Sequence, residues 1–181
     1  VIEDAKQMTQ ERGHLDGLSD SIKDELYKTI GLGGLKYYLL KVDPKKGMQF
    51  NPEESVDLNG NTGPFIQYTY ARIQSILRKA GAFNKESETG LFLEPAEKTL
   101  LKDLSEFPSV IEEAGKNYSP ALLANYTYEL VKNYNSFYQL LSIIKEKDAN
   151  KKAFRIAISY KVGAVIKLSM QLLGVDVPER M

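Results

Sequence analysis

One short segment constrains the fold of this chain more than any other: the turn Gly60-Asn-Thr-Gly-Pro64 and the residues that follow it. Gly60 tolerates a positive φ, so the chain can turn sharply here. Pro64 presets φ for the first position of a helix, with Thr62 or Gly63 as its cap. Apolar residues then recur every three or four positions, which predicts a helix with one buried stripe. The stripe consists of Ile66, Tyr70, Ile73, Leu77 and Ala80.

The residues before this segment also have helical patterns. Residues 1–12 predict a helix that ends at Gly13, a glycine suited to a C-terminal cap. Ser19 or Ser21 can cap a second helix that runs through Tyr27.

Glycines then interrupt the pattern. Residues 31–34, Gly-Leu-Gly-Gly, predict a turn between that helix and a further helical run over residues 35–42. Residues 47–62 are the least helical part of the chain, and we interpret them as a junction between two domains.

The second half of the chain predicts a series of packed helices. Phe83 to Gly90 reads as a polar loop, and Pro95 opens a helix that Pro108 is expected to break. Ser119-Pro120 is a strong start signal, because it joins a capping hydroxyl to a proline at the first helical position.

Asp148 or Asn150 can cap the last helix, which Gly174 closes. This helix is apolar on more than one side, so we expect it to be central, with Gly163 permitting a close helix approach. The predicted fold is all-α: a helical bundle over residues 59–181, preceded by a smaller helical part over residues 1–58.

Composition limits the possible functions. The chain has no cysteine, which removes disulfides, thiolate metal sites and cysteine nucleophiles. Its net charge of zero argues against a general polyanion binder, although residues 1–60 carry −3 (8 basic, 11 acidic) and residues 61–181 carry +3 (16 basic, 13 acidic). No apolar run has the length of a membrane span, and the first residues lack the basic and then apolar pattern expected of a signal peptide. The first residues read as the middle of a helix, so we expect a piece of a longer protein.

No set of residues predicts catalysis or metal binding. The one histidine, His14, lies in a predicted turn without the partners that a metal ligand requires. Glu53-Glu54 and Glu112-Glu113 are adjacent in sequence, so each pair is divided between different helix faces. We therefore predict neither a catalytic residue nor a metal site in this chain.

The positive signal is aromatic. Eleven tyrosines and seven phenylalanines offer rings that can stack on unpaired bases. The alternative is that Tyr126, Tyr134 and Tyr138 pack between helices with their hydroxyls at the rim. Basic residues lie near these rings in the sequence, where they form either a solvated face or a set of phosphate contacts. They are Arg72, Arg78, Lys79, Lys145, Lys147, Lys151, Lys152 and Arg155.

The turn and helix over residues 48–73 resemble arginyl-tRNA synthetases at the junction between catalytic body and anticodon-binding domain. The resemblance extends over essentially the whole chain, from Leu35-Lys-Tyr-Tyr-Leu-Leu-Lys-Val-Asp-Pro-Lys-Lys46 to the ending Val177-Pro-Glu-Arg-Met181. It implies the C-terminal part of a class I synthetase, with a helical anticodon-binding domain of the DALR type. Such enzymes attach arginine to tRNA with ATP and magnesium, but both class I ATP signatures are absent here. The fragment itself is therefore expected to be inactive and to hold no cofactor.

The resemblance also implies site residues. Matched by motif, Tyr68, Tyr138 and Met181 would make stacking or apolar contacts with splayed anticodon bases, and Arg72 and Arg78 would contact phosphates. The implied partner is the anticodon loop of the arginine tRNA, with ATP and arginine bound only by the missing catalytic domain. We expect a cytoplasmic monomer without membrane contact.

Two alternatives remain open from the sequence. A neutral chain with many amphipathic helices also fits a helical protein-interaction domain. The corresponding domain of another class I synthetase would have a similar pattern.

Overall fold

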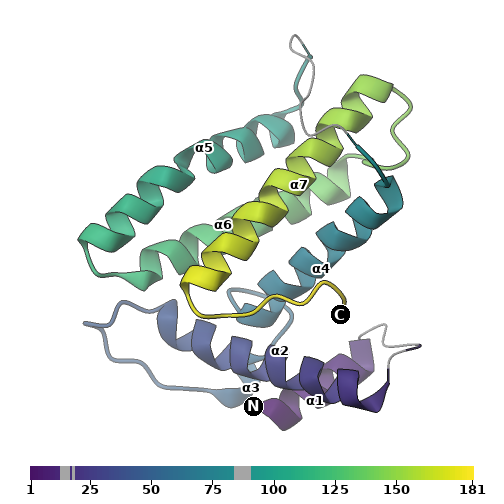
Figure 1. The fold of residues 1–181 in the computed structure, drawn as a ribbon. Coiled ribbons are helices and arrows are strands. Elements are labelled where there is room, and N and C mark those ends of the chain that lie inside the picture. The colour runs from purple at the N-terminus through teal and green to yellow at the C-terminus, as the bar shows by residue number, and fades with distance from the viewer. Residues whose placement is uncertain (13–16, 18, 84–90) are drawn as a thin grey trace.

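The computed structural model of this chain describes residues 1–12, 17, 19–83 and 91–181. These residues form helices and no strand, so the all-α prediction is confirmed (Figure 1). The predictions for Gly13, for His14 and for the loop that ends at Gly90 lie outside the described residues. The helices are α1 (Ile2–Arg12), α2 (Asp20–Leu40), α3 (Pro52–Ser55), α4 (Gly63–Ala80), α5 (Pro95–Lys116), α6 (Pro120–Leu140) and α7 (Ala149–Leu172).

The helices form two layers (Figure 1). Helices α4 to α7 make a bundle with one large hydrophobic core, while α1, α2 and α3 pack across its end around a smaller cluster of Ala5, Leu26, Ile30 and Val56. The C-terminal tail, residues 173–181, runs from the end of α7 back between the layers. None of the described helices is long and apolar enough to cross a lipid bilayer.

The division at residue 58 stays a prediction. The two clusters match the two predicted parts, but each cluster also takes a side chain from the other part. Tyr37 of α2 is fully buried in the core of the bundle, and Met181 packs against the smaller cluster. The parts are therefore joined by shared packing as well as by the chain.

Local capping chemistry sets several helix starts as predicted. The Thr62 hydroxyl accepts a hydrogen bond from the backbone N–H of Phe65 (3.3 Å), so Thr62 is the cap of α4 and Gly63 its first residue. The Asp148 carboxylate likewise accepts from two backbone N–H groups at the start of α7. Pro120 begins α6, although Ser119 makes no side-chain cap there.

The predicted turn at residues 31–34 is wrong, because α2 continues through these glycines to Leu40. They allow neighbouring backbones to come close. A Cβ atom on Gly34 would lie 2.6 Å from the Ser55 carbonyl oxygen, and one on Gly63 would lie 2.7 Å from the Gly33 carbonyl oxygen. Glycine at these positions is thus a packing requirement, and its weak helix propensity is overcome by tertiary contact.

The predicted break at Pro108 is also wrong, because α5 runs without interruption from Pro95 to Lys116. Pro108 lies on the exposed side of α5, while Phe107 beside it is buried and stacks on Tyr126 of α6, with ring centroids 5.7 Å apart. A proline inside a helix costs about 3 kcal/mol. Packing of α5 against α6 on both sides of Pro108 offsets this cost.

The prediction for Gly163 is confirmed. This glycine of α7 faces α4 so closely that a Cβ atom would lie 2.9 Å from Cγ2 of Ile73. The close contact places α7 in the centre of the bundle and fixes α4, which carries most of the candidate site.

Candidate nucleic-acid interface

The five site residues predicted from the sequence all line one hollow of about 450 Å³. We call it the aromatic hollow. Helix α4 contributes most of its wall, α6 contributes one ring, and the C-terminal tail closes one side. The lining residues are Tyr68, Ala71, Arg72, Ser75, Arg78, Lys79, Tyr138, Arg180 and Met181.

Two tyrosine rings and one guanidinium group form the centre of this hollow. The Arg72 guanidinium carbon lies 4.9 Å from the ring centroid of Tyr68 and 5.1 Å from that of Tyr138. Both distances are within the range of cation–π attraction. Tyr138 is 41% exposed, so a ring on the surface of α6 remains available to a ligand.

Arg72, for which the resemblance implied a phosphate contact, also makes bonds within the protein. Its Nη1 atom donates to the side-chain oxygen of Asn135 on α6, and the guanidinium is half-buried between the two rings. Arg72 therefore joins α4 to α6 and holds the two tyrosines in place, in addition to supplying positive charge.

Arg78 lies at the rim of the hollow and stays exposed. Its Nη1 atom donates to the Glu179 carbonyl oxygen (3.2 Å), which holds the C-terminal tail against α4. The buried amide of Gln67 donates to the Asp176 carbonyl oxygen (2.8 Å) on the same tail. These two bonds place Met181 where it both lines the hollow and packs against the smaller cluster.

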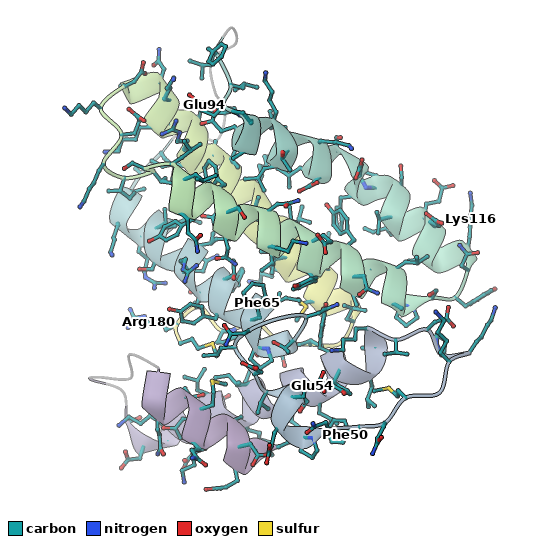
Figure 2. All side chains as sticks on the ribbon, turned by 180° about the vertical axis from the view of Figure 1, so that it is seen from behind. Phe50, Glu54, Phe65, Glu94, Lys116 and Arg180 are labelled. Atoms are coloured by element: carbon teal, nitrogen blue, oxygen red, sulfur yellow. The ribbon has the colours of Figure 1, made fainter. Side chains whose placement is uncertain are left out.

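A second hollow of about 430 Å³ lies beside the first and shares Tyr68 and Arg72 with it. Phe65 lines it, and both Phe65 and Arg180 lie where the bundle meets the layer of α1 to α3 (Figure 2). The sequence reasoning missed this hollow. The spacing of Phe65, Tyr68 and Arg72, at three and four residues on one face of α4, was the signal that could have found its first wall. Its other wall comes from α6, through Lys132, Asn135, Ser136 and Gln139.

Core packing was the alternative role for Tyr126, Tyr134 and Tyr138, and the structure shows that it applies to two of them. Tyr134 is fully buried and donates to the Ser159 hydroxyl, and burial raises the pKa of its own hydroxyl. The half-buried Tyr126 donates to the Asp103 carbonyl oxygen, and burial raises its pKa as well. Core packing therefore accounts for these two rings, and Tyr138 is the one of the three that is exposed.

The basic cluster around the start of α7 is not one continuous RNA-facing surface. Arg155 is 3% exposed, and its guanidinium donates to the carboxylates of Glu97 (2.7 Å) and Glu146 (2.6 Å). This buried ion pair joins α5, α7 and the loop before α7. Arg155 is therefore structural, which corrects the reading of this residue as part of a solvated or phosphate-binding face.

The chemistry of the interface is that of binding. Within the described ranges, no three His, Cys, Asp or Glu side chains gather as a metal site. Exposed rings beside guanidinium and ammonium groups can stack on unpaired bases and contact phosphates. Fold and site together define an all-helical domain suited to single-stranded nucleic acid.

The comparisons with known proteins narrow this class. The sequence profile described as "DALR anticodon binding domain" matches residues 66–181. The chain belongs to this family of anticodon-binding domains, which bind tRNA. The profile begins within α4, two residues before Tyr68, so its match includes all five predicted site residues.

Individual relatives agree with one another. The chain is 59% identical to the arginine–tRNA ligase of Flavobacterium psychrophilum, in a match that covers 98% of this chain. It is 50% identical to the arginine–tRNA ligase of Bacteroides thetaiotaomicron, in a match that covers 100% of this chain. Among solved structures, it is similar to Thermus thermophilus arginyl-tRNA synthetase with a TM-score of 0.90 and 27% identity over 99% of this chain. The arginyl-tRNA synthetase of Plasmodium falciparum follows with a TM-score of 0.83 and 26% identity, also over 99%.

The chain spans 29% and 31% of the length of the two curated relatives, and it matches their C-terminal part. It covers 31% and 32% of the two solved chains. The predicted resemblance to arginyl-tRNA synthetases is thus confirmed. A helical protein-interaction domain and the domain of another class I synthetase are not favoured.

Proposed function

We propose that this chain is the tRNA-binding part of an arginine–tRNA ligase and that its aromatic hollow receives unpaired bases of the anticodon loop. One observation carries the proposal. Residues that are far apart in sequence, Tyr68 and Arg72 on α4, Tyr138 on α6 and Met181 in the tail, line one hollow on a domain of the anticodon-binding family.

Each residue has a chemical role in this proposal. Tyr68 and Tyr138 offer ring faces to splayed bases, a contact worth about 1–3 kcal/mol per base. Met181 supplies an apolar, polarizable contact at the edge of the hollow. The exposed Arg78 at the rim binds phosphate, and Arg72 supplies hydrogen-bond donors from between the rings.

We further propose that the protein to which the chain belongs charges the arginine tRNA with arginine through an arginyl-adenylate. ATP, magnesium and arginine would bind to a catalytic domain outside these 181 residues, because neither class I ATP signature occurs in them. We also propose that this protein is a cytoplasmic monomer. Arginine-dependent aminoacylation by the full-length gene product tests this part of the proposal, and charging with a different amino acid would contradict it.

The binding itself can be tested with the 181-residue chain. Its affinity is measured for the anticodon stem–loop of the arginine tRNA and for the same stem–loop carrying an unrelated anticodon. We expect tighter binding of the first. Equal affinities at moderate salt would refute recognition of the anticodon.

Two tyrosine variants make the test specific. Tyr138→Ala is expected to weaken cognate binding by roughly 5- to 150-fold, the range that corresponds to one stacked base. Tyr118→Ala is the matched control, because Tyr118 is 88% exposed but lies in the turn between α5 and α6, outside the hollow. It should leave the affinity unchanged. An unchanged affinity of Tyr138→Ala would remove Tyr138 from the site.

A further inference from the structure

Asn135 lies on α6 opposite Arg72, in the wall of the second hollow. Its side-chain nitrogen donates to the Thr69 hydroxyl (2.9 Å) and to the Val131 carbonyl oxygen (3.1 Å). Its side-chain oxygen accepts from Nη1 of Arg72. Asn135 therefore bonds to α4 at two points, and its own turn of α6 supplies the third bond.

The direction of every bond in this chain of contacts is determined. Thr69 is fully buried, and its hydroxyl donates to the Phe65 carbonyl oxygen (3.0 Å). Because a hydroxyl has one proton, Thr69 must accept from the Asn135 amide nitrogen. The amide oxygen of Asn135 consequently points at Arg72. This orientation is the complementary one, because a guanidinium has N–H donors and no acceptor. No other residue type of this size offers two donors and an acceptor in this arrangement.

This network fixes how Arg72 meets a ligand. The Arg72 guanidinium carbon lies over the rings of Tyr68 and Tyr138, 4.9 Å and 5.1 Å from their centroids, and Asn135 restricts the group at Nη1. A guanidinium has five N–H donors in one plane. When one donor is anchored and the group is packed against the two rings, the directions of the remaining donors are restricted as well. Arg72 borders both hollows, which places these donors beside any base or phosphate bound there.

We propose that Asn135 is a positioning residue for RNA binding: it holds the Arg72 guanidinium between Tyr68 and Tyr138 so that its free donors are preorganised for the bound loop. This inference rests on the proposed function and assigns a role to a residue that does not line the aromatic hollow. Asn135 acts through Arg72, so its contribution to affinity depends on the presence of that side chain.

A double-mutant cycle tests this dependence. Affinity for the arginine-tRNA anticodon stem–loop is measured for the 181-residue chain and for Asn135→Ala, Arg72→Ala and the double variant. Asn135→Ala is expected to weaken binding on the order of tenfold, as for a lost hydrogen bond to a charged group. In the Arg72→Ala background the same change should have no further effect. The salt dependence should stay as in the unmodified chain for Asn135→Ala, because the charge of Arg72 remains, and should become less steep for Arg72→Ala.

The matched control is Asn133→Ala. Asn133 lies two residues earlier on α6, and its amide also joins two helices, since it donates to the Asp103 carboxylate of α5 (2.8 Å). Its loss should lower the melting temperature without changing RNA affinity. Thr69→Ala serves as a second variant if Asn135→Ala does not fold, because it removes a bond to the Asn135 amide while leaving Arg72 in place. It should weaken binding in the same direction, again only when Arg72 is present.

The outcomes separate this inference from the proposed function. Effects of Asn135→Ala and Arg72→Ala that simply add, or an unchanged affinity of Asn135→Ala, would overturn the positioning role. If Tyr138→Ala still weakens cognate binding in that case, anticodon recognition by the hollow stands. If the unmodified chain does not distinguish the two stem–loops at all, the proposed function fails and the positioning role fails with it.

Discussion

Replacing Gly34 with alanine should destabilise the packing of α2 against α3, within the layer that α1, α2 and α3 form. Gly34 lies in the middle of α2, where it faces the short helix α3. An added Cβ atom would lie 2.6 Å from the Ser55 carbonyl oxygen and 3.3 Å from Cγ1 of Val56. Ordinary contacts of this kind begin at 3.4 Å, so α2 and α3 must separate by several tenths of an ångström. Ser55 and Val56 are both buried, which makes this separation costly.

A control substitution isolates the steric cost. Gly115→Ala is also a glycine-to-alanine change inside a helix, and its Cβ atom would meet nothing within 4 Å. Both variants gain up to about 1 kcal/mol of helix propensity. The difference between them is therefore the overpacking term, about 1–3 kcal/mol. For a chain of 181 residues this corresponds to a melting temperature roughly 2–12 °C lower for Gly34→Ala than for Gly115→Ala.

The assay is thermal and urea unfolding of the two variants beside the unmodified chain. Gly115→Ala should be at least as stable as the unmodified chain. If Gly34→Ala proves as stable as Gly115→Ala, the close approach of α2 and α3 does not need glycine, and the explanation given for an unbroken α2 is wrong.

Three further predictions concern charge. Arg155→Met should destabilise the fold by about 3–5 kcal/mol in urea unfolding, because it leaves the buried Glu97 carboxylate without its partner, while stem–loop affinity stays unchanged. Arg78→Ala should weaken binding and reduce the slope of log affinity against log salt by about 0.7, the value for one phosphate contact on a single strand, and an unchanged slope would exclude that contact. The backbone N–H of Asp148 donates to the Glu146 carboxylate and lowers the pKa of this carboxyl below its ordinary value of 4.5. The ionised Glu146 carboxylate therefore stabilises the fold above pH 4.5, and this stabilisation is lost as the pH falls through the lowered pKa. Glu146→Gln should therefore show a smaller loss of stability than the unmodified chain when the pH is lowered from about 5 to about 2.

Much of the candidate site could be predicted from the sequence because its residues come with recognisable local motifs. Tyr68 and Arg72 follow the turn that begins α4, and the resemblance to synthetases implied the roles of these two residues and of Arg78, Tyr138 and Met181. The structure brings these residues into one hollow, while their contacts with RNA stay predictions. Asn135 was missed, since an asparagine on an amphipathic helix gives no signal until its neighbours on the other helix are known.

The reading of Arg155 and of Pro108 shows the same limit. In sequence, Arg155 belongs to a run of basic residues that resembles a solvated face. In the structure Arg155 is buried, and its Nε atom lies 2.7 Å from Oε1 of Glu97 on α5, a helix far from Arg155 in the sequence. Pro108 is a helix breaker by its own chemistry, yet α5 continues because both halves of the helix bury apolar side chains against α6.

The sequence alone determined the helical class and the starts of α4, α5, α6 and α7. These depend on hydrogen bonds between a cap such as Thr62 and residues two or three positions away, and on periodic apolar stripes. Only the tertiary structure decided that residues 31–34 remain helical, that Arg155 is buried and that Asn135 holds Arg72 between two rings. Each of these depends on contacts between residues far apart in sequence. Their free energy exceeds local propensities of about 1 kcal/mol, and no local pattern encodes it.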